Sequence, residues 1–213
     1  MAEHLSDEEK VEAIKQWLQT NGPGIAAGIL IGLAGIGGWQ WWQNRQQAIA
    51  EAASGHYDTL LSAVEADDAP RARGQAAVLT DTYADTTYGA LAGLMLARLD
   101  AADGANEQAI EWLRWVLQHT DRRDLRDIAR LRLARLLLAE DRLDEAQAQL
   151  DQILSAAYSA EQEELRGDIH LARNDIERAR SAYQAALAAQ GSAGGDGQLL
   201  RWKLNSLPAA TGS

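Results

Sequence analysis

A long uncharged stretch near the N-terminus constrains this chain more than any other feature. Between Gln16 and Asn44 no side chain carries a charge, and residues 24–42 read GIAAGILIGLAGIGGWQWW. A soluble helix packed on one face would show polar residues every third or fourth position, and this stretch shows none before Gln40. At about 1.5 Å per residue, a helix over residues 22–42 spans about 32 Å, against about 30 Å for a bilayer core. The stretch therefore predicts a transmembrane helix over residues 22–43.

Tryptophans mark both ends of this stretch. Trp39, Trp41 and Trp42 lie where the helix should emerge, and Trp17 lies near the other end. Amphipathic indole rings prefer the headgroup layer, so we expect these four residues at the two membrane interfaces. A cleaved signal peptide would need a basic start and a shorter apolar run. Residues 1–21 are acidic overall, so we favour a permanent anchor over a cleaved signal or a soluble core helix.

The glycines of the stretch fall on one helical face. Gly24, Gly28 and Gly32 recur at four-residue spacing, and Gly35 lies on the same side. Two overlapping G-x-x-x-G units make a flat ridge that another membrane helix can approach closely. The alternative interpretation is that glycine is simply common in membrane helices. Because the few large apolar residues favour insertion only modestly, we predict that the ridge docks on another membrane protein.

A short helix is expected before the uncharged stretch. Ser6 and Glu9 have the spacing of a capping box, in which each side chain satisfies the backbone of the other residue. Asn21-Gly22 has the residue types that end a helix. We therefore expect residues 1–21 to form a short amphipathic segment that stops at this pair.

The charges on either side of the stretch predict its orientation. Lys10 and Lys15 precede it, and only Arg45 follows it closely. Positive residues are retained on the cytoplasmic side, so we expect residues 1–21 in the cytoplasm and the long C-terminal part across the membrane.

Beyond Arg45 the composition is that of a helical array. Alanine, leucine, glutamate, glutamine and arginine dominate there and favour helix, and β-branched residues are sparse. Apolar segments of helical length alternate with short polar turns, which is typical of stacked α-hairpins. The expected breaks are Asp67 to Pro70, Asp85-Thr86, Asp103-Gly104, Thr120-Asp121, Glu140-Asp141, Ala157-Tyr158, Asn174-Asp175 and Gly191 to Gly197.

The array repeats internally. Pairs of small residues stand twelve positions apart, and a large residue follows four positions after each pair. Helices cross closely only where both present small side chains, and the large residue fills the groove to the next repeat. This is the arrangement of a tetratricopeptide repeat, with an alanine-rich bundle as the alternative. The pairs are Ala97 and Ala109, Ala134 and Ala146, Gly167 and Ala179; the large residues are Leu113, Leu150 and Tyr183.

We therefore predict an all-α fold, with a single N-terminal transmembrane helix followed by a tetratricopeptide-like α-hairpin array over residues 44–207 and a tail at residues 208–213. Residues 45–83 are interpreted as a further, degenerate hairpin. Residues 198–206 are expected to form a closing helix, whose Leu199 and Trp202 cover the last repeat.

The sequence offers no arrangement typical of catalysis. The absence of cysteine excludes thiol chemistry, disulfides and thiolate zinc sites, and the net charge of −11 argues against nucleic acid. The four histidines lack metal-ligand spacing, and the glycine-rich segment 191–197 lacks the lysine of a phosphate loop. We expect neither a cofactor nor a metal, and interpret the chain as a binding protein rather than an enzyme.

Binding is expected in the groove that the first helices of the hairpins share. The groove would present apolar positions ringed by arginines and acids, which suits an extended peptide. The alternative is that several of the apolar residues pack in the core. The candidate groove residues are Leu91, Leu94, Arg98, Ile128, Leu131, Arg135, Glu164, Asp168 and Leu171.

Several stretches together resemble one family. In order they are VEAIKQWLQTNG, GGWQWW, TYGALAGLMLA, LRLARLLL, LRGD, ARSAY and KLNSL, spread over residues 9–207. The chain is similar to the YfgM-type ancillary subunits of the SecYEG translocon of Gram-negative bacteria. The resemblance implies a single-span inner-membrane protein with a cytoplasmic N-terminus and a periplasmic tetratricopeptide-like domain, and no catalytic residues.

The resemblance also implies partners. These are the SecYEG translocon, a membrane-anchored periplasmic chaperone of the peptidyl-prolyl isomerase type, and a cytoplasmic stress-response regulator. The implied role is to help pass secreted proteins to periplasmic chaperones. The alternative is a membrane-tethered scaffold, or a regulator that sequesters an envelope stress factor through residues 1–21.

Overall fold

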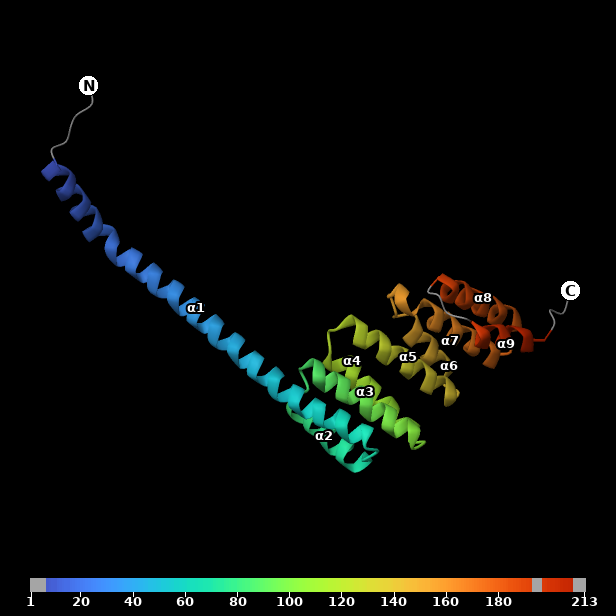
Figure 1. Ribbon diagram of the computed structural model, residues 1–213. Coiled ribbons are helices and arrows are strands. Elements are labelled where there is room, and N and C mark those ends of the chain that lie inside the picture. Colours follow the sequence, from blue (N-terminus) through green and yellow to red (C-terminus); the bar gives the residue numbers. More distant parts are fainter. Residues whose placement is uncertain (1–6, 193–196, 209–213) are drawn as a thin grey trace, which may run out of the picture. The chain divides into compact units, whose positions relative to one another are not determined.

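The computed structural model describes residues 7–192 and 197–208, and every regular element in these ranges is a helix (Figure 1). The chain divides into two compact units, Met1–Glu51 and Ala52–Ser213. The all-α prediction is thus confirmed. The helices are α1 (Asp7–Glu65), α2 (Ala69–Thr82), α3 (Thr87–Ala102), α4 (Asn106–His119), α5 (Arg123–Ala139), α6 (Leu143–Leu150), the 3-10 turn η1 (Ala156–Tyr158), α7 (Ser159–Ala172), α8 (Ile176–Ser192) and α9 (Gln198–Ser206).

Helix α1 does not end where the sequence predicted. It continues through Asn21-Gly22 into the second unit. The side-chain Nδ2 of Asn21 donates to the Trp17 carbonyl one turn earlier, at 3.0 Å. A helix ends at such a pair only when the glycine turns into the left-handed region, and Gly22 does not. The predicted cap at Ser6 lies outside the described residues, and the borders at residues 21 and 43 stay predictions.

The part of α1 that carries the uncharged stretch belongs to the first unit. Over the residues whose placement is described, no helix combines the length and apolar character that a membrane crossing requires.

The turns inside the hairpins share one backbone device that the sequence did not reveal. Each contains a residue with positive φ, and the amide that follows it donates to a carbonyl five residues back, as from Asp68 to Ala63 at 2.9 Å. This is the Schellman closure of a helix, which satisfies carbonyls that would otherwise lack a partner. The turn residues are Asp67, Gly104, Asp141 and Asn174.

The predicted small-residue crossings lie in the core. Both members of all three pairs are buried, and Leu113, Leu150 and Tyr183 are fully buried beside them. The third crossing uses glycine where the others use alanine, because a Cβ at Gly167 would overlap the Tyr183 ring. The larger side chain on one helix is thus matched by a smaller one on its neighbour.

Two clusters of buried residues run through most of the second unit. One joins the end of α1 to α2 and α3, with Leu60 and Leu79 fully buried, so residues 45–83 do contribute a hairpin to the array. The other runs from α3 to α7. Consecutive hairpins therefore share a continuous core, as stacked repeats do.

The closing helix α9 forms at residues 198–206 as predicted, but it packs through a different face. Leu199 and Trp202, the expected contacts, are 58% and 65% exposed. Leu200 and Leu207 are buried instead, against Ala179 and Tyr183 of α8. Successive helical residues point about 100° apart, so a shift of one position turns the packing face away. Which leucine faces inward is fixed by the surface of α8.

The match between Gly167 and Tyr183 gives a direct test. We expect Gly167→Ala to lower the free energy of unfolding by about 1–3 kcal/mol, because the new methyl group overfills a packed crossing. The matched control is Gly74→Ala in α2, where a Cβ would meet nothing within 4 Å. There alanine's higher helix propensity should raise the free energy by up to about 1 kcal/mol. Urea denaturation followed by tryptophan fluorescence measures both, and equal stabilisation by the two changes would contradict the packing account.

Candidate functional site

The candidate helix-packing residues lie on one continuous helix without an intramolecular neighbour on their face. A Cβ added at Gly24, Gly28, Gly32 or Gly35 would meet nothing within 4 Å in the described part of the chain. Gly24, Gly28, Gly32 and Gly35 thus form a flat strip along α1, the glycine strip, which is open to an approaching helix.

The candidate interface tryptophans are all exposed. Trp17, Trp39, Trp41 and Trp42 keep between 49% and 65% of their surface. The Trp39 and Trp42 rings lie 5.4 Å apart, and the Arg45 guanidinium lies 5.9 Å from the Trp41 ring. An aromatic group with a cation beside it is the composition of a membrane interface.

The four apolar groove candidates of the first two repeats act mainly in packing. Leu94 and Leu131 are buried, and Leu91 and Ile128 are half-buried against the same core cluster. For these residues the structure favours the alternative of a core position. Leu171, in the third repeat, is 41% exposed.

The two groove arginines come together around a cavity. Arg98 of α3 and Arg135 of α5 are exposed and line a space of about 170 Å³. The structure adds a third arginine, Arg132, which the prediction missed because it lies two positions before the small residue of its repeat. The remaining lining residues are Ala97, Ala101, Leu113 and Leu136.

Arg132 is held among positive charges. Its side chain is exposed as a whole, but its guanidinium group reaches back to the array and donates to the Leu94 carbonyl at 3.4 Å. Desolvation of this group lowers the pKa of Arg132, and the charges of Arg98 and Arg135 lower it further. The cavity therefore has an apolar wall and a strongly positive rim.

The two groove acids are occupied by the chain itself. The Lys203 ammonium of α9 donates to Glu164 at 2.7 Å and to both carboxylate oxygens of Asp168, at 2.7 and 2.8 Å. The Tyr183 hydroxyl also donates to Asp168, at 2.7 Å. The acidic end of the predicted groove is thus an internal contact that fastens α9 to α7.

This cluster raises the pKa of two of its groups, the Lys203 ammonium and the Tyr183 hydroxyl. Burial lowers the pKa of Lys203, but its hydrogen bonds to Asp168 and Glu164 outweigh that effect and leave the pKa raised. Burial and the hydrogen bond to Asp168 raise the pKa of the Tyr183 hydroxyl strongly.

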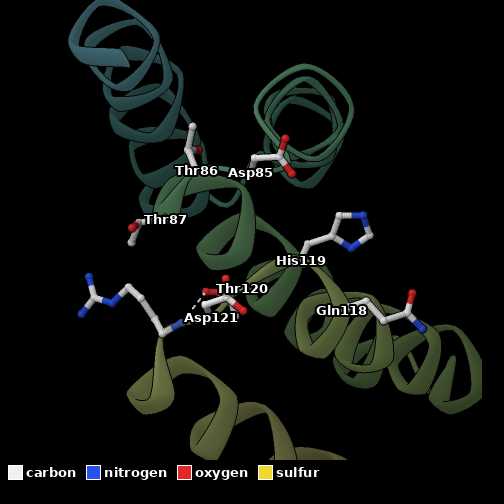
Figure 2. Close-up of a pocket in the computed structure, with 8 residues that line it drawn as sticks. Asp85, Thr86, Thr87, Gln118, His119, Thr120 and Asp121 are labelled. Atoms are coloured by element: carbon white, nitrogen blue, oxygen red, sulfur yellow. Dashed lines mark hydrogen bonds between the residues drawn. The ribbon is translucent and has the colours of Figure 1, made fainter. Parts of the chain in front are cut away.

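A further cavity lies at the ends of helices α2 to α5 rather than in the predicted groove. It measures about 630 Å³ and is lined by polar residues of the α2–α3 and α4–α5 turns (Figure 2). His119 is stacked on Trp115 with ring centroids 4.0 Å apart, and its Nδ1 lies 2.9 Å from the Trp115 carbonyl. Among the described residues no group of histidines and carboxylates is placed to hold a metal ion.

The stacked hairpins and their shared groove define a helical-repeat protein of the protein-interaction class. The family described as a tetratricopeptide repeat-like domain matches residues 15–209. No solved structure matches the chain significantly.

Curated relatives make the assignment specific. The ancillary SecYEG translocon subunit of Escherichia coli (strain K12) is 32% identical over 185 residues, which cover 85% of this chain and 87% of the relative. The proteins of the same name from Haemophilus influenzae and Neisseria gonorrhoeae are 28% and 26% identical, each over 97% of this chain and all of the relative. The chain belongs to this family of ancillary SecYEG translocon subunits with a tetratricopeptide repeat-like domain, and the resemblance seen in its sequence is confirmed.

The attachment of α9 should weaken at high pH. The Lys203 contribution is complete below the ordinary lysine pKa of about 10.4 and is lost as pH rises through the higher pKa of the folded state. Above about pH 10 the unfolded chain also gains from ionising Tyr183, which the folded chain keeps neutral. We expect the free energy of unfolding to fall from about pH 10 upward.

The Lys203→Gln variant isolates this effect. It should cost about 1–3 kcal/mol near neutral pH, because two acids lose their cation, and should show a flatter decline above about pH 10. Trp202→Ala, on the exposed face of the same helix, is the control and should change stability by less than about 0.5 kcal/mol. If the free energy of unfolding falls with pH equally steeply in the wild type and in Lys203→Gln, ionisation of Lys203 does not contribute to the stability of the fold.

Proposed function

We propose that this chain is a membrane-anchored, Sec-associated protein whose helical repeats mediate protein–protein interactions. The observation that carries the proposal is family membership over nearly the whole chain, since the relatives are named as ancillary subunits of the SecYEG translocon. The absence of cysteine suits an oxidising compartment for the repeats.

The anchor is assigned to residues 22–43. In this stretch the large apolar side chains of Leu30, Ile31, Leu33 and Ile36 keep 61% to 73% of their surface exposed. At about 25 cal/mol per Å², leaving such side chains in water costs free energy that lipid or another membrane helix would recover. Exposed apolar side chains in such a number support the proposal that this stretch lies in lipid or against another membrane helix.

The orientation follows from the flanking charges. Lys10 and Lys15 keep residues 1–21 on the cytoplasmic side of the inner membrane, and residues 44–207 lie in the periplasm. The repeats there meet secreted chains as they leave the translocon and help pass them to periplasmic chaperones. A membrane-anchored isomerase-type chaperone is the partner proposed for this step.

The second candidate function acts from the other side of the membrane. It is a membrane-tethered scaffold, or a regulator that sequesters an envelope stress factor through residues 1–21. The net acidic charge of this segment is the observation that favours it, because a charged surface selects its partners. Deleting residues 1–15 separates the two functions, since only the second needs them.

The glycine strip supplies the contact with the translocon. Gly28 and Gly32 lie one helical turn apart, so their missing side chains let a partner helix pack against the backbone. We expect Gly28→Leu combined with Gly32→Leu to reduce recovery of SecYEG subunits about tenfold in pull-downs from detergent-solubilised membranes, which corresponds to about 1.4 kcal/mol.

Gly37→Leu is the matched control for this experiment. Gly37 is nine residues from Gly28, which places it about half a turn away on the helix, and a Cβ there also meets nothing within 4 Å. The control should recover SecYEG like the wild type. If the double variant does so too, the glycine strip is not the docking surface.

A further inference from the structure

Three equivalent positions of the array carry two positive charges and one negative charge. The residue after the small residue of each first helix is Arg98 in α3, Arg135 in α5 and Asp168 in α7. Each follows a buried crossing residue by one step, so the three occupy equivalent faces of their helices. The charged group that contacts one of these positions therefore indicates what kind of group can contact the other two.

At the last repeat the charge of Asp168 is neutralised by Lys203 of the closing helix α9. The ammonium group of Lys203 in α9 lies 2.7 Å from Asp168 Oδ1 and 5.5 Å from the ring centroid of Tyr183. Here adjacent helices present opposite charges to each other, and the groove is closed.

Between α3 and α5 the facing charges have the same sign. Arg98 of α3 faces Arg132 and Arg135 of α5 across the 170 Å³ cavity. Within the described part of the chain, none of the three has a carboxylate within 4.0 Å. The charges of Arg98 and Arg135 lower the pKa of Arg132, so the three guanidinium groups repel one another, and folding gains nothing from holding them together.

The chain does not lack acids to pair with these arginines. It has 31 aspartates and glutamates against 20 lysines and arginines, and at least eight of the sixteen arginines beyond residue 51 form an ion pair with a carboxylate. What distinguishes Arg98, Arg132 and Arg135 is that they line one cavity together without a carboxylate beside them among the described residues, although acids are plentiful in the chain. Arginines with a carboxylate partner are Arg73, Arg114, Arg122, Arg130, Arg142, Arg166, Arg173 and Arg178.

The floor of the cavity is apolar. Two alanines of α3, Leu113 of α4 and Leu136 of α5 line it. A volume of about 170 Å³ is well below the roughly 300–1,000 Å³ of small-molecule sites, so it accommodates one side chain rather than a metabolite.

We propose that the pocket formed by Arg98, Arg132 and Arg135, the arginine pocket, binds an acidic segment of a partner protein that places one apolar side chain in the cavity and carboxylates on the surrounding guanidinium groups. Arginine forks bind carboxylates through paired hydrogen bonds, and the apolar floor adds burial. The pKa of Arg132 is lowered first by desolvation and then by the charges of Arg98 and Arg135, and an incoming carboxylate would offset that second contribution. The inference rests on the proposed interaction function and names the chemistry of one partner.

A peptide experiment on the full chain in detergent tests the proposal. The probe is a fluorescein-labelled, C-terminally amidated Gly-Ser-Gly-Glu-Leu-Glu-Gly-Ser-Gly, measured by fluorescence anisotropy. We expect it to bind at least about tenfold more tightly than the same peptide with lysines in place of both glutamates, and than the one with glycine in place of leucine. Binding should weaken with added salt, because the ion pairs are screened.

Arginine variants locate the site. Arg98→Gln and Arg135→Gln should each weaken binding of the glutamate peptide about tenfold, whereas Arg123→Gln, an exposed position on the same helix α5, should not. Each pocket variant should unfold at the same or a higher temperature than the wild type, since it removes repulsion. A drop in unfolding temperature would assign these arginines a structural role, and equal binding of the glutamate and lysine peptides would overturn the proposal whatever the variants do.

Translocon recovery separates this inference from the proposed function. The combined Arg98→Gln and Arg135→Gln variant should still recover SecYEG, because its glycine strip is intact. Normal recovery without binding of the glutamate peptide by the wild type would overturn the arginine pocket alone. Peptide binding without any recovery of SecYEG by the wild type would overturn the Sec association and leave the pocket.

Discussion

Close crossings at small residues are the constraint on which the array depends. Two helices of a hairpin approach only where neither presents a large side chain, and the large residue one turn later then fills the space beside them. The third crossing shows how tightly this is matched, because Tyr183 takes the position of a leucine and its neighbour Gly167 takes the position of an alanine. Every groove position is fixed relative to these crossings, and the interaction surface follows from them.

The sign of the charge at each equivalent position determines whether another residue of the chain pairs with it. The Tyr183 hydroxyl, placed by the third crossing, donates to Asp168, and Asp168 accepts from Lys203 of the closing helix. Packing and ion pairing are thus coupled at the last repeat. Two repeats earlier the equivalent residue is Arg98, and it lines a cavity with Arg132 and Arg135. In our proposal a partner protein, and not this chain, supplies the carboxylates for these three arginines.

Local chemistry made most of the fold predictable. The helix breaks were visible because polar turn residues punctuate apolar segments, and the crossings were visible because small residues recur at fixed spacing. The packing face of α9 was not, because Leu199 and Leu200 are alike and only the surface of α8 distinguishes them. The burial of Leu94 and the approach of Arg132 to Arg98 also depend on how neighbouring hairpins stack. Asn21-Gly22 misled because both residue types also occur inside helices.

The central claim is that the helix over residues 22–43 carries the repeats to the periplasmic side of the inner membrane. The chain contains no cysteine, so single cysteines can report topology without background. Glu12→Cys and Ser181→Cys, both at exposed positions, would be treated in spheroplasts with a maleimide that cannot cross the inner membrane. The account predicts labelling at position 181 in intact spheroplasts and at position 12 only after lysis. Protection of position 181 until lysis would contradict it.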